Sequence, residues 1–291
     1  VHHDAGGPAP FAGRAGRIAA GQVIRLYPKG EFETRPEHDT PEILRLDFSD
    51  ALLMLYGSAV AHPEQLPLLD APEPSKVVAA RQLLQHLGAV DSNDQFTQLG
   101  RRMSALGIHP RLARLAIACA ENGHPELGAI AAALLSERDI RLENRSRSFG
   151  AARRPIDVVA GQSDLFELVE LYEWSQDLDF SPRALRDIGV DSRTVRTVNQ
   201  AASRLTRILA TGVSNGRAAP ISNSTSPPSR EQVLARAVLL AFTDRIAKRR
   251  TSQRPDFILR NGQVARQADN SVVIDASFIV AVDVDERRSP G

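Results

Sequence analysis

Cysteine is almost absent from the chain, because Cys119 is the only one in 291 residues. A single thiol cannot build an intramolecular disulfide framework, so the protein is expected to fold in a reducing compartment. The seven histidines show neither the HExxH pattern nor the Cys/His spacing of a zinc site. No structural metal is therefore predicted.

Long apolar runs are also missing. No stretch approaches the roughly 20 apolar residues that span a bilayer, although 42% of the residues are hydrophobic and can fill cores. The opening sequence VHHDAGGPAP has neither the basic start nor the apolar centre of a secretory signal. These absences predict a cytoplasmic protein without a membrane partner.

Neither sign of charge is in excess, since 36 basic residues nearly balance 35 acidic ones. Only local clusters could favour an anionic partner. Arginine-rich clusters do occur, at residues 141–154, 193–207 and 245–254. Because aromatic residues make up only 5% of the chain, contact with a nucleic-acid backbone is predicted rather than base stacking.

The first third of the chain alternates helical and turn-like patterns. A helix is expected over residues 41–56, and the proline-rich segment 61–75 predicts a loop. The next helix is expected to start after Pro74 with Ser75 as its N-cap and to end at Gly88.

The segment AVDSNDQFTQLGRRMSAL then indicates a small hairpin with SNDQ at its turn, followed by a helix that begins near Gln98. Helix, hairpin and helix in this order suggest a winged helix. A helix and hairpin within some other mixed domain is the open alternative.

Beyond the hairpin the pattern predicts a helical bundle and then a small sheet. Pro110 and Pro125 each open an Ala-rich helix of a helical hairpin, and two further helices begin at the cap-type residues Ser163 and Asp191. The Ser, Asn, Gly and Pro-rich residues 211–230 indicate a linker. A helix at about 229–247 is then followed by the apolar runs FILR, VVID and FIVAVDV, which predict three or four antiparallel strands. The fold class is therefore mainly α with small β elements (α+β).

The helix that starts at Asp191 separates into two faces when its residues are placed at helical spacing. Its apolar face carries Val195, Val198, Ala202, Leu205 and Leu209. The opposite face carries the first candidate nucleic-acid contacts, Arg193, Arg196, Arg204 and Arg207. Guanidinium groups bind phosphates bidentately and release condensed counterions, although an ordinary solvated helix face remains the alternative. Arg249 and Arg250 are the second candidates.

Several motifs, taken in order, resemble a known family. GRAGR at residues 13–17 precedes a strand-like segment. Downstream follow TPEILRLDFSDALLMLYG, LLQHLGAVDSNDQFTQLGRRMSALGIHPRLARLAIACAE, AALLSERD and AFTDRIAKRRTSQRPDFILRNGQVAR. Together these motifs resemble the C-terminal half of bacterial ATP-dependent RNA helicases of the HrpB type, in the DEAH-box group, over roughly residues 13–284.

The resemblance implies a role for Arg14 and Arg17. GRAGR resembles the end of helicase motif VI, whose arginines in the family reach across the cleft between two RecA-like domains to the phosphates of ATP. Arg14 and Arg17 are thus expected to be the catalytic, ATP-binding residues of an intact enzyme that uses ATP and Mg. Pro10 and Phe11 stand where the family has Gln and Arg.

Other helicase motifs are missing from the chain. It contains no GxxxxGK[ST] loop and no DEAH-like tetrad. Such motifs cradle the phosphates and hold magnesium. The chain alone is therefore expected to need no cofactor and to be inactive as an ATPase.

The resemblance also implies an organisation and a function. Residues 1–12 would be a disordered or unrelated tail, 13–40 a remnant of the second RecA-like domain, 41–105 the winged helix, 106–210 a helical ratchet domain, 211–230 the linker and 231–291 a partial HrpB-type β-rich domain. The implied function is an accessory helicase region that binds single-stranded RNA and couples it to RecA-like domains absent from this chain.

Two other functions stay open. A standalone winged-helix module would bind duplex DNA through the helix at 98–106, with Arg101 and Arg102 as base-reading candidates. A non-functional gene fragment, or a subunit that only docks onto RecA domains of another chain, would expose a wide apolar surface around residues 43–55.

Overall fold

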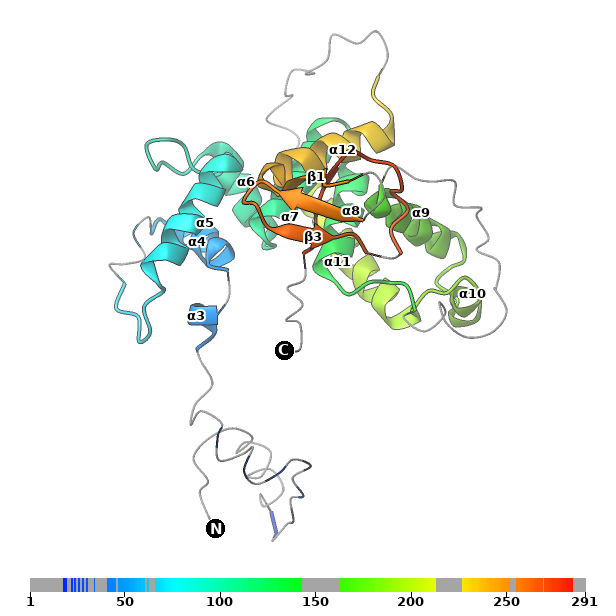
Figure 1. The fold of residues 1–291 in the computed structure, drawn as a ribbon, viewed down its shortest axis with the longest axis horizontal. Coiled ribbons are helices and arrows are strands. Elements are labelled where there is room, and N and C mark those ends of the chain that lie inside the picture. Colours follow the sequence, from blue (N-terminus) through cyan, green and yellow to red (C-terminus); the bar gives the residue numbers. More distant parts are fainter. Residues whose placement is uncertain are drawn as a thin grey trace.

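The computed structural model describes residues 41–45, 47–60, 66–142, 163–212, 227–251, 255–268 and 270–284, together with residue 62 and a few single residues before 41. Most of the described chain is helical, and a four-stranded antiparallel sheet lies against the helices (Figure 1). Arg14 and Arg17 lie outside the described residues, as does most of the strand-like segment that follows them.

The helix–hairpin–helix pattern is present near the N-terminal end of the described chain. It consists of α4 (Ser49–Gly57), α5 (Pro74–His86) and α6 (Gln98–Leu106), and the single turn α3 (Glu42–Arg45) precedes it. The hairpin is reduced to one bridge between Val90 and Phe96. Thr97 caps α6, because its hydroxyl accepts the backbone N–H of Gly100 at 2.9 Å.

The helix expected over residues 41–56 is interrupted after α3. Asp47 Oδ1 accepts the backbone N–H of Ser49 at 2.9 Å, so a new helix begins at that residue. Leu52 is fully buried, whereas Met54 stays 61% exposed. Among the described residues of this segment, Met54 is the one large apolar side chain in the exposed class. The wide apolar surface that a docking remnant would expose is therefore not seen here.

The expected N-cap of α5 is also wrong. The helix begins at Pro74, and the hydroxyl of Ser75 donates to the carboxylate of Glu73 at 2.6 Å instead of capping the backbone. Proline suits the first helical position because its missing N–H needs no partner there. The helix consequently starts two residues earlier than a cap at Ser75 would place it.

A helical bundle follows the winged helix. It contains α7 (Pro110–Glu121), α8 (Pro125–Ser136), α9 (Asp164–Asp177), α10 (Pro182–Asp187) and α11 (Ser192–Gly212). Both predicted proline starts are confirmed, and α8 packs mainly against α7 and α11. The short helix α10 was not predicted from the sequence.

Close packing between α7 and α8 depends on Gly128. A Cβ at this position would lie 2.6 Å from the carbonyl oxygen of Ala116 and 2.8 Å from the Cβ of Cys119. Neither atom is a flexible side-chain end, so Gly128→Ala should push the helices apart and lower the free energy of unfolding by about 2 kcal/mol. Chemical denaturation measures this loss. Because alanine normally favours a helix by up to about 1 kcal/mol over glycine, a stabilised variant would contradict the close packing.

The C-terminal part consists of one helix and the sheet. Its elements are α12 (Arg230–Ala241), the 3-10 turn η3 (Thr243–Arg245), β1 (Ile246–Arg249), β2 (Asp256–Leu259), β3 (Val264–Arg266) and β4 (Phe278–Val280), with strand order β3-β2-β1-β4. The helix expected to reach residue 247 therefore ends at residue 241. Ala247 pairs with Leu259 on one side and Ile279 on the other, which makes β1 a central strand.

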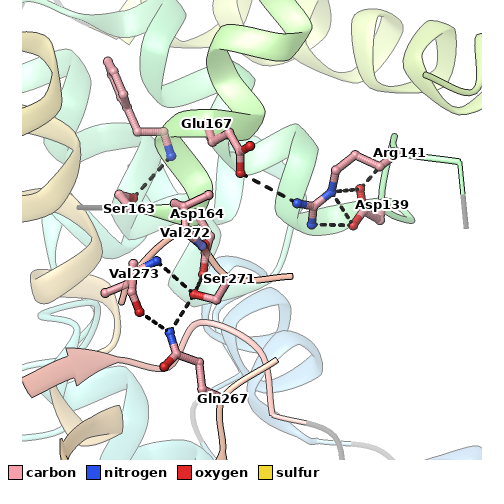
Figure 2. A network of polar contacts seen from close by, with 10 residues as sticks. Asp139, Arg141, Ser163, Asp164, Glu167, Gln267, Ser271, Val272 and Val273 are labelled. Carbon is pink, nitrogen blue, oxygen red and sulfur yellow. Dashed lines mark hydrogen bonds and ion pairs between the residues drawn. The ribbon is translucent and has the colours of Figure 1, made fainter. Parts of the chain in front are cut away.

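The run VVID, predicted to be a strand, instead ties the sheet region to α9. The backbone N–H of Val272 donates to Asp164 Oδ1 at 2.7 Å, and the hydroxyl of Ser271 donates to the other oxygen of that carboxylate at 2.8 Å (Figure 2). Gln267 supports the loop by donating to Ser271 Oγ at 2.7 Å. A carboxylate distant in sequence thus takes the hydrogen bond that a strand partner would otherwise provide.

A second junction joins the helices to the sheet at η3. Arg111, on α7, is only 8% exposed and donates to both carboxylate oxygens of Asp244 at 2.6 and 2.7 Å. Its guanidinium also donates to the carbonyl of Ala241 at 3.0 Å and lies 5.4 Å from the ring centroid of Phe242. Burial acts to raise the pKa of Asp244, but the hydrogen bonds and charge of Arg111 outweigh it, so that this pKa is lowered.

Candidate nucleic-acid interface

The helix that carries the first candidates, α11, begins with the expected cap. Asp191 Oδ1 accepts the backbone N–H and the hydroxyl of Thr194, both at 2.8 Å. These hydrogen bonds, the backbone one foremost, lower the pKa of Asp191. A charged cap of this kind fixes where the helix starts and hence which residues face outward.

The apolar face of α11 is buried, as its periodicity predicts. The buried residues are Val195, Val198, Ala202, Leu205 and Leu209. The helix packs mainly on α8 and also touches α6. Tyr172 of α9 adds a lateral contact by donating its hydroxyl to Asn199 at 2.8 Å, and burial raises the pKa of this tyrosine to about 12. The orientation of α11 is thereby fixed from two sides.

The opposite face of α11 carries the α11 arginine row, which we define as Arg193, Arg196, Arg204 and Arg207. All of its members are exposed. Among the described residues, no carboxylate forms an ion pair with any of them. The row therefore presents positive charge that nothing in the described part of the chain neutralises at contact distance.

Neighbouring residues place this row between two parts of the fold. Arg196 Nη2 donates to the carbonyl of Phe180, just before α10, at 3.3 Å. Arg204 Nη1 would lie 3.9 Å from a Cβ built at Gly107, the first residue of the connection between α6 and α7. The row consequently runs from the start of α10 to the junction between the winged helix and the bundle.

The arginines of α6 are engaged differently. Arg102 forms an ion pair with Glu121 at 2.6 Å. Arg101 lies 5.9 Å from the ring centroid of Phe96 and donates to the carbonyl of that residue at 3.2 Å. Both candidates for base reading by a standalone winged helix thus already contact groups within the chain.

The second pair of candidates, Arg249 and Arg250, point to opposite sides of the sheet because side chains alternate along a strand. Arg249 donates to the carbonyls of Ala276 and Ile274 at 2.8 and 2.7 Å, and its guanidinium lies 4.7 Å from the ring centroid of the buried Phe257. Arg250 is exposed. The structure therefore places Arg249 among groups that hold the sheet together and Arg250 on the surface.

This difference predicts unequal effects of the same substitution on stability. Arg249→Gln should lower the free energy of unfolding by about 2 kcal/mol, because charged hydrogen bonds to two carbonyls are lost. The matched variant Arg250→Gln should change it by less than about 0.5 kcal/mol. Urea denaturation of both variants measures the two values, and equal losses would show that the two arginines play the same part.

The remaining basic cluster is described only at its start. Arg141 pairs with Asp139 at 2.7 Å and lies 3.8 Å from Glu167 (Figure 2). Its charge is thus matched by two carboxylates. The other arginines of residues 141–154 lie outside the described residues.

Within the described ranges, no group of three or more His, Cys, Asp or Glu side chains could hold a metal ion. The described helices include none long and apolar enough to cross a membrane.

Comparisons with known proteins show what the chain is similar to. Residues 80–108 match the family described as helicase associated domain (HA2), winged-helix. The chain is 31% identical over 170 residues to the ATP-dependent RNA helicase HrpA of Escherichia coli, covering 56% of the chain and 13% of the relative. It is 36% identical over 126 residues to the ATP-dependent RNA helicase HrpB of the same organism, covering 43% and 16%.

The crystal structure of the E. coli DExH-box NTPase HrpB is similar to most of this chain. It matches with a TM-score of 0.60 and 27% identity, over 96% of this chain and 28% of that one. The chain thus spans a small part of the relatives it matches. These findings confirm the resemblance to the C-terminal region of bacterial DEAH-box RNA helicases, and they confirm the winged helix and the mainly α class with a small sheet.

Proposed function

We propose that this chain is an accessory region of an ATP-dependent RNA helicase and binds single-stranded RNA through the α11 arginine row. In this proposal the row contacts phosphates, and the winged helix and bundle hold it in a fixed position. RecA-like domains supplied outside the chain would provide the motor. The similarity to HrpA and HrpB supports the helicase context.

The observation that carries the proposal is that no described carboxylate forms an ion pair with any member of the row. Its arginines are exposed, and no described carboxylate pairs with them, whereas Arg102, Arg111 and Arg141 all have acidic partners. Guanidinium groups left in this state on one rigid helix can each contact a phosphate without breaking an internal ion pair.

The standalone winged-helix alternative has weaker support. Its recognition helix offers Arg101 and Arg102, and both are engaged within the chain. Reading a base edge with Arg102 would require breaking the ion pair with Glu121. Binding through α11 breaks no ion pair among the described residues, although Arg196 and Arg207 donate to the carbonyls of Phe180 and Ser203 at 3.3 Å.

In this proposal ATP is bound by the RecA-like domains outside the chain. Arg14 and Arg17 stay predicted ATP-facing residues of an intact enzyme. The chain contains no phosphate-binding loop of the GxxxxGK[ST] type, so its residues do not fit a complete ATP and Mg site. We therefore assign no step of ATP hydrolysis to this chain.

Photocrosslinking locates the RNA on the protein. A short oligouridine with 4-thiouridine at every second position would be irradiated with the whole chain, and crosslinked peptides identified by mass spectrometry. The proposal expects crosslinks within α11 or the turn at Phe180 that borders the row. Crosslinks confined to α6 and the hairpin before it would favour the winged-helix module instead.

A further inference from the structure

The C-terminal sheet has a small hydrophobic core of its own. Its buried residues, Ala247, Phe257 and Leu259, form a cluster that is separate from the core of the helices. Phe242, directly after α12, still belongs to the helical core. The chain therefore passes from one core to the other through the short turn η3.

The apolar contact between the two cores is limited. Of the described residues that follow η3, Val280 and Val282 are the ones whose side chains pack against the helical core, and both are only partly buried. Units of one chain are expected to move relative to each other unless the interface between them is large and hydrophobic. The packing of these two valines does not form such an interface.

Two carboxylates join the sheet to the helices by hydrogen bonds. Asp244, in η3, accepts both hydrogen bonds of the Arg111 guanidinium on α7, at 2.6 and 2.7 Å. Asp164, on α9, accepts the hydroxyl of Ser271 and the backbone N–H of Val272 (Figure 2). Water can replace the partners of such groups when they separate, so the net cost of opening polar contacts is modest.

From this arrangement we infer that the sheet region, which we define as the described residues from 246 to 284, is a separately docked unit. It leaves the helices as one body, while the helices and the sheet both stay folded. The contacts at Asp244 and Asp164 hold it in place, and η3 is its hinge. In the open form the guanidinium of Arg111 and both carboxylates face water. This motion goes beyond the proposed function, which needs only the exposed face of α11.

Two backbone amides distinguish undocking from unfolding of the sheet. The N–H of Val272 donates across the junction to Asp164 at 2.7 Å, so its exchange with solvent requires that contact to open. The N–H of Arg249 donates within the sheet region to the carbonyl of Ser277 at 2.9 Å, so its exchange requires the sheet itself to open. A unit that undocks intact exposes the first amide and keeps the second protected.

Hydrogen exchange of the whole wild-type chain, followed by NMR, tests this order of opening. Relative to its intrinsic rate, the Val272 amide should exchange at least about tenfold faster than the Arg249 amide and than the amides of α8. Equal protection of Val272 and Arg249 would overturn the inference, because the sheet would then open only by unfolding.

The same experiment in low concentrations of urea measures how much surface the opening exposes. Exchange at Val272 should accelerate with urea, with a slope smaller than that of global unfolding. No acceleration would mean that only the loop around Val272 fluctuates, and a slope equal to the global one would mean that the sheet does not undock before the chain unfolds. Either result would overturn the inference without any substitution.

Asp244→Asn tests whether the two contacts open together. It weakens the contact at the hinge, far from Val272 in the sequence. If the sheet region is one unit, exchange at Val272 should accelerate roughly a hundredfold, because every open form no longer has to break the ion pair of a buried arginine. A wild-type rate at Val272 would show two independent contacts and would overturn the inference.

Gly128→Ala is the matched control for a general loss of stability. It disturbs the packing between α7 and α8 but replaces neither docking carboxylate. Amides of α8 should therefore exchange faster, whereas Val272 should keep its wild-type rate because the bundle stays folded when the sheet undocks. Acceleration of Val272 by the same factor as α8 would show that it exchanges only through global unfolding, contrary to the inference. None of these measurements involves RNA, so the proposal for α11 is tested separately.

Discussion

Replacing the whole α11 arginine row by glutamine is expected to weaken binding of single-stranded RNA roughly a hundredfold near 0.1 M salt. Each neutralised phosphate contact contributes about 0.7 to the slope of log affinity against log salt for single strands. Loss of all the contacts should therefore flatten the slope by about 3. Because phosphates carry no sequence information, RNAs of different sequence should lose affinity to the same degree.

A lysine version of the same row is the matched control. It keeps the charge and loses only the bidentate geometry, so it should retain most of the affinity and nearly the full salt slope. The residues of the row are exposed, and circular dichroism should show an unchanged fold for both versions. An unchanged affinity and slope in the glutamine version would mean that this face of α11 is merely solvated.

Asp244→Asn is expected to lower the free energy of unfolding by about 3 kcal/mol. It leaves the guanidinium of Arg111, which is 8% exposed, without its carboxylate inside the junction between α7 and η3. The reverse substitution, Arg111→Met, should cost less, because the side chain of Asp244 is 53% exposed and water can hydrate it. Urea denaturation of both variants measures this asymmetry, and a larger loss for Arg111→Met would contradict it.

The same pair predicts a dependence on pH. Because the pKa of Asp244 is lowered in the folded chain, its contribution is fully present above the unfolded value of about 4 and is lost as the pH falls through the folded pKa. The stability difference between the wild type and Asp244→Asn should thus be constant near neutral pH and shrink below about pH 4. A stability difference that grows as the pH falls would show that the carboxylate of Asp244 destabilises the fold, contrary to this prediction.

The sequence predicted best the features that depend on neighbours along the chain. The starts of α7 and α8 at prolines, the cap at Asp191 and the two faces of α11 follow from local periodicity and capping. Each is set within a few residues, so no knowledge of distant contacts is needed.

The failures share a dependence on distant partners. Residues 246 and 247 continue the helical pattern of α12, yet they form a strand because β2 and β4 pair with them. Val272 was expected in a strand, but Asp164 takes its N–H. The sequence pattern around a residue does not show which distant segment will pair with it, and in both cases that pairing determines the secondary structure.

Side-chain roles were harder to predict than elements. Arg249 and Arg250 are equivalent by composition, and only the strand register shows that they lie on opposite faces. The alternation of Lys248 and Arg249 could have suggested that the lysine faces outward, had the strand been predicted.

Fluorescence anisotropy of the whole chain with single-stranded RNA and with duplex DNA, over a salt series and with or without ATP, decides whether the chain is an RNA-binding accessory region. We expect a preference for single-stranded RNA that weakens steeply with salt and is the same with ATP. Selective binding to duplex DNA, or no binding to either nucleic acid at low salt, would contradict the proposal that the chain is an RNA-binding accessory region.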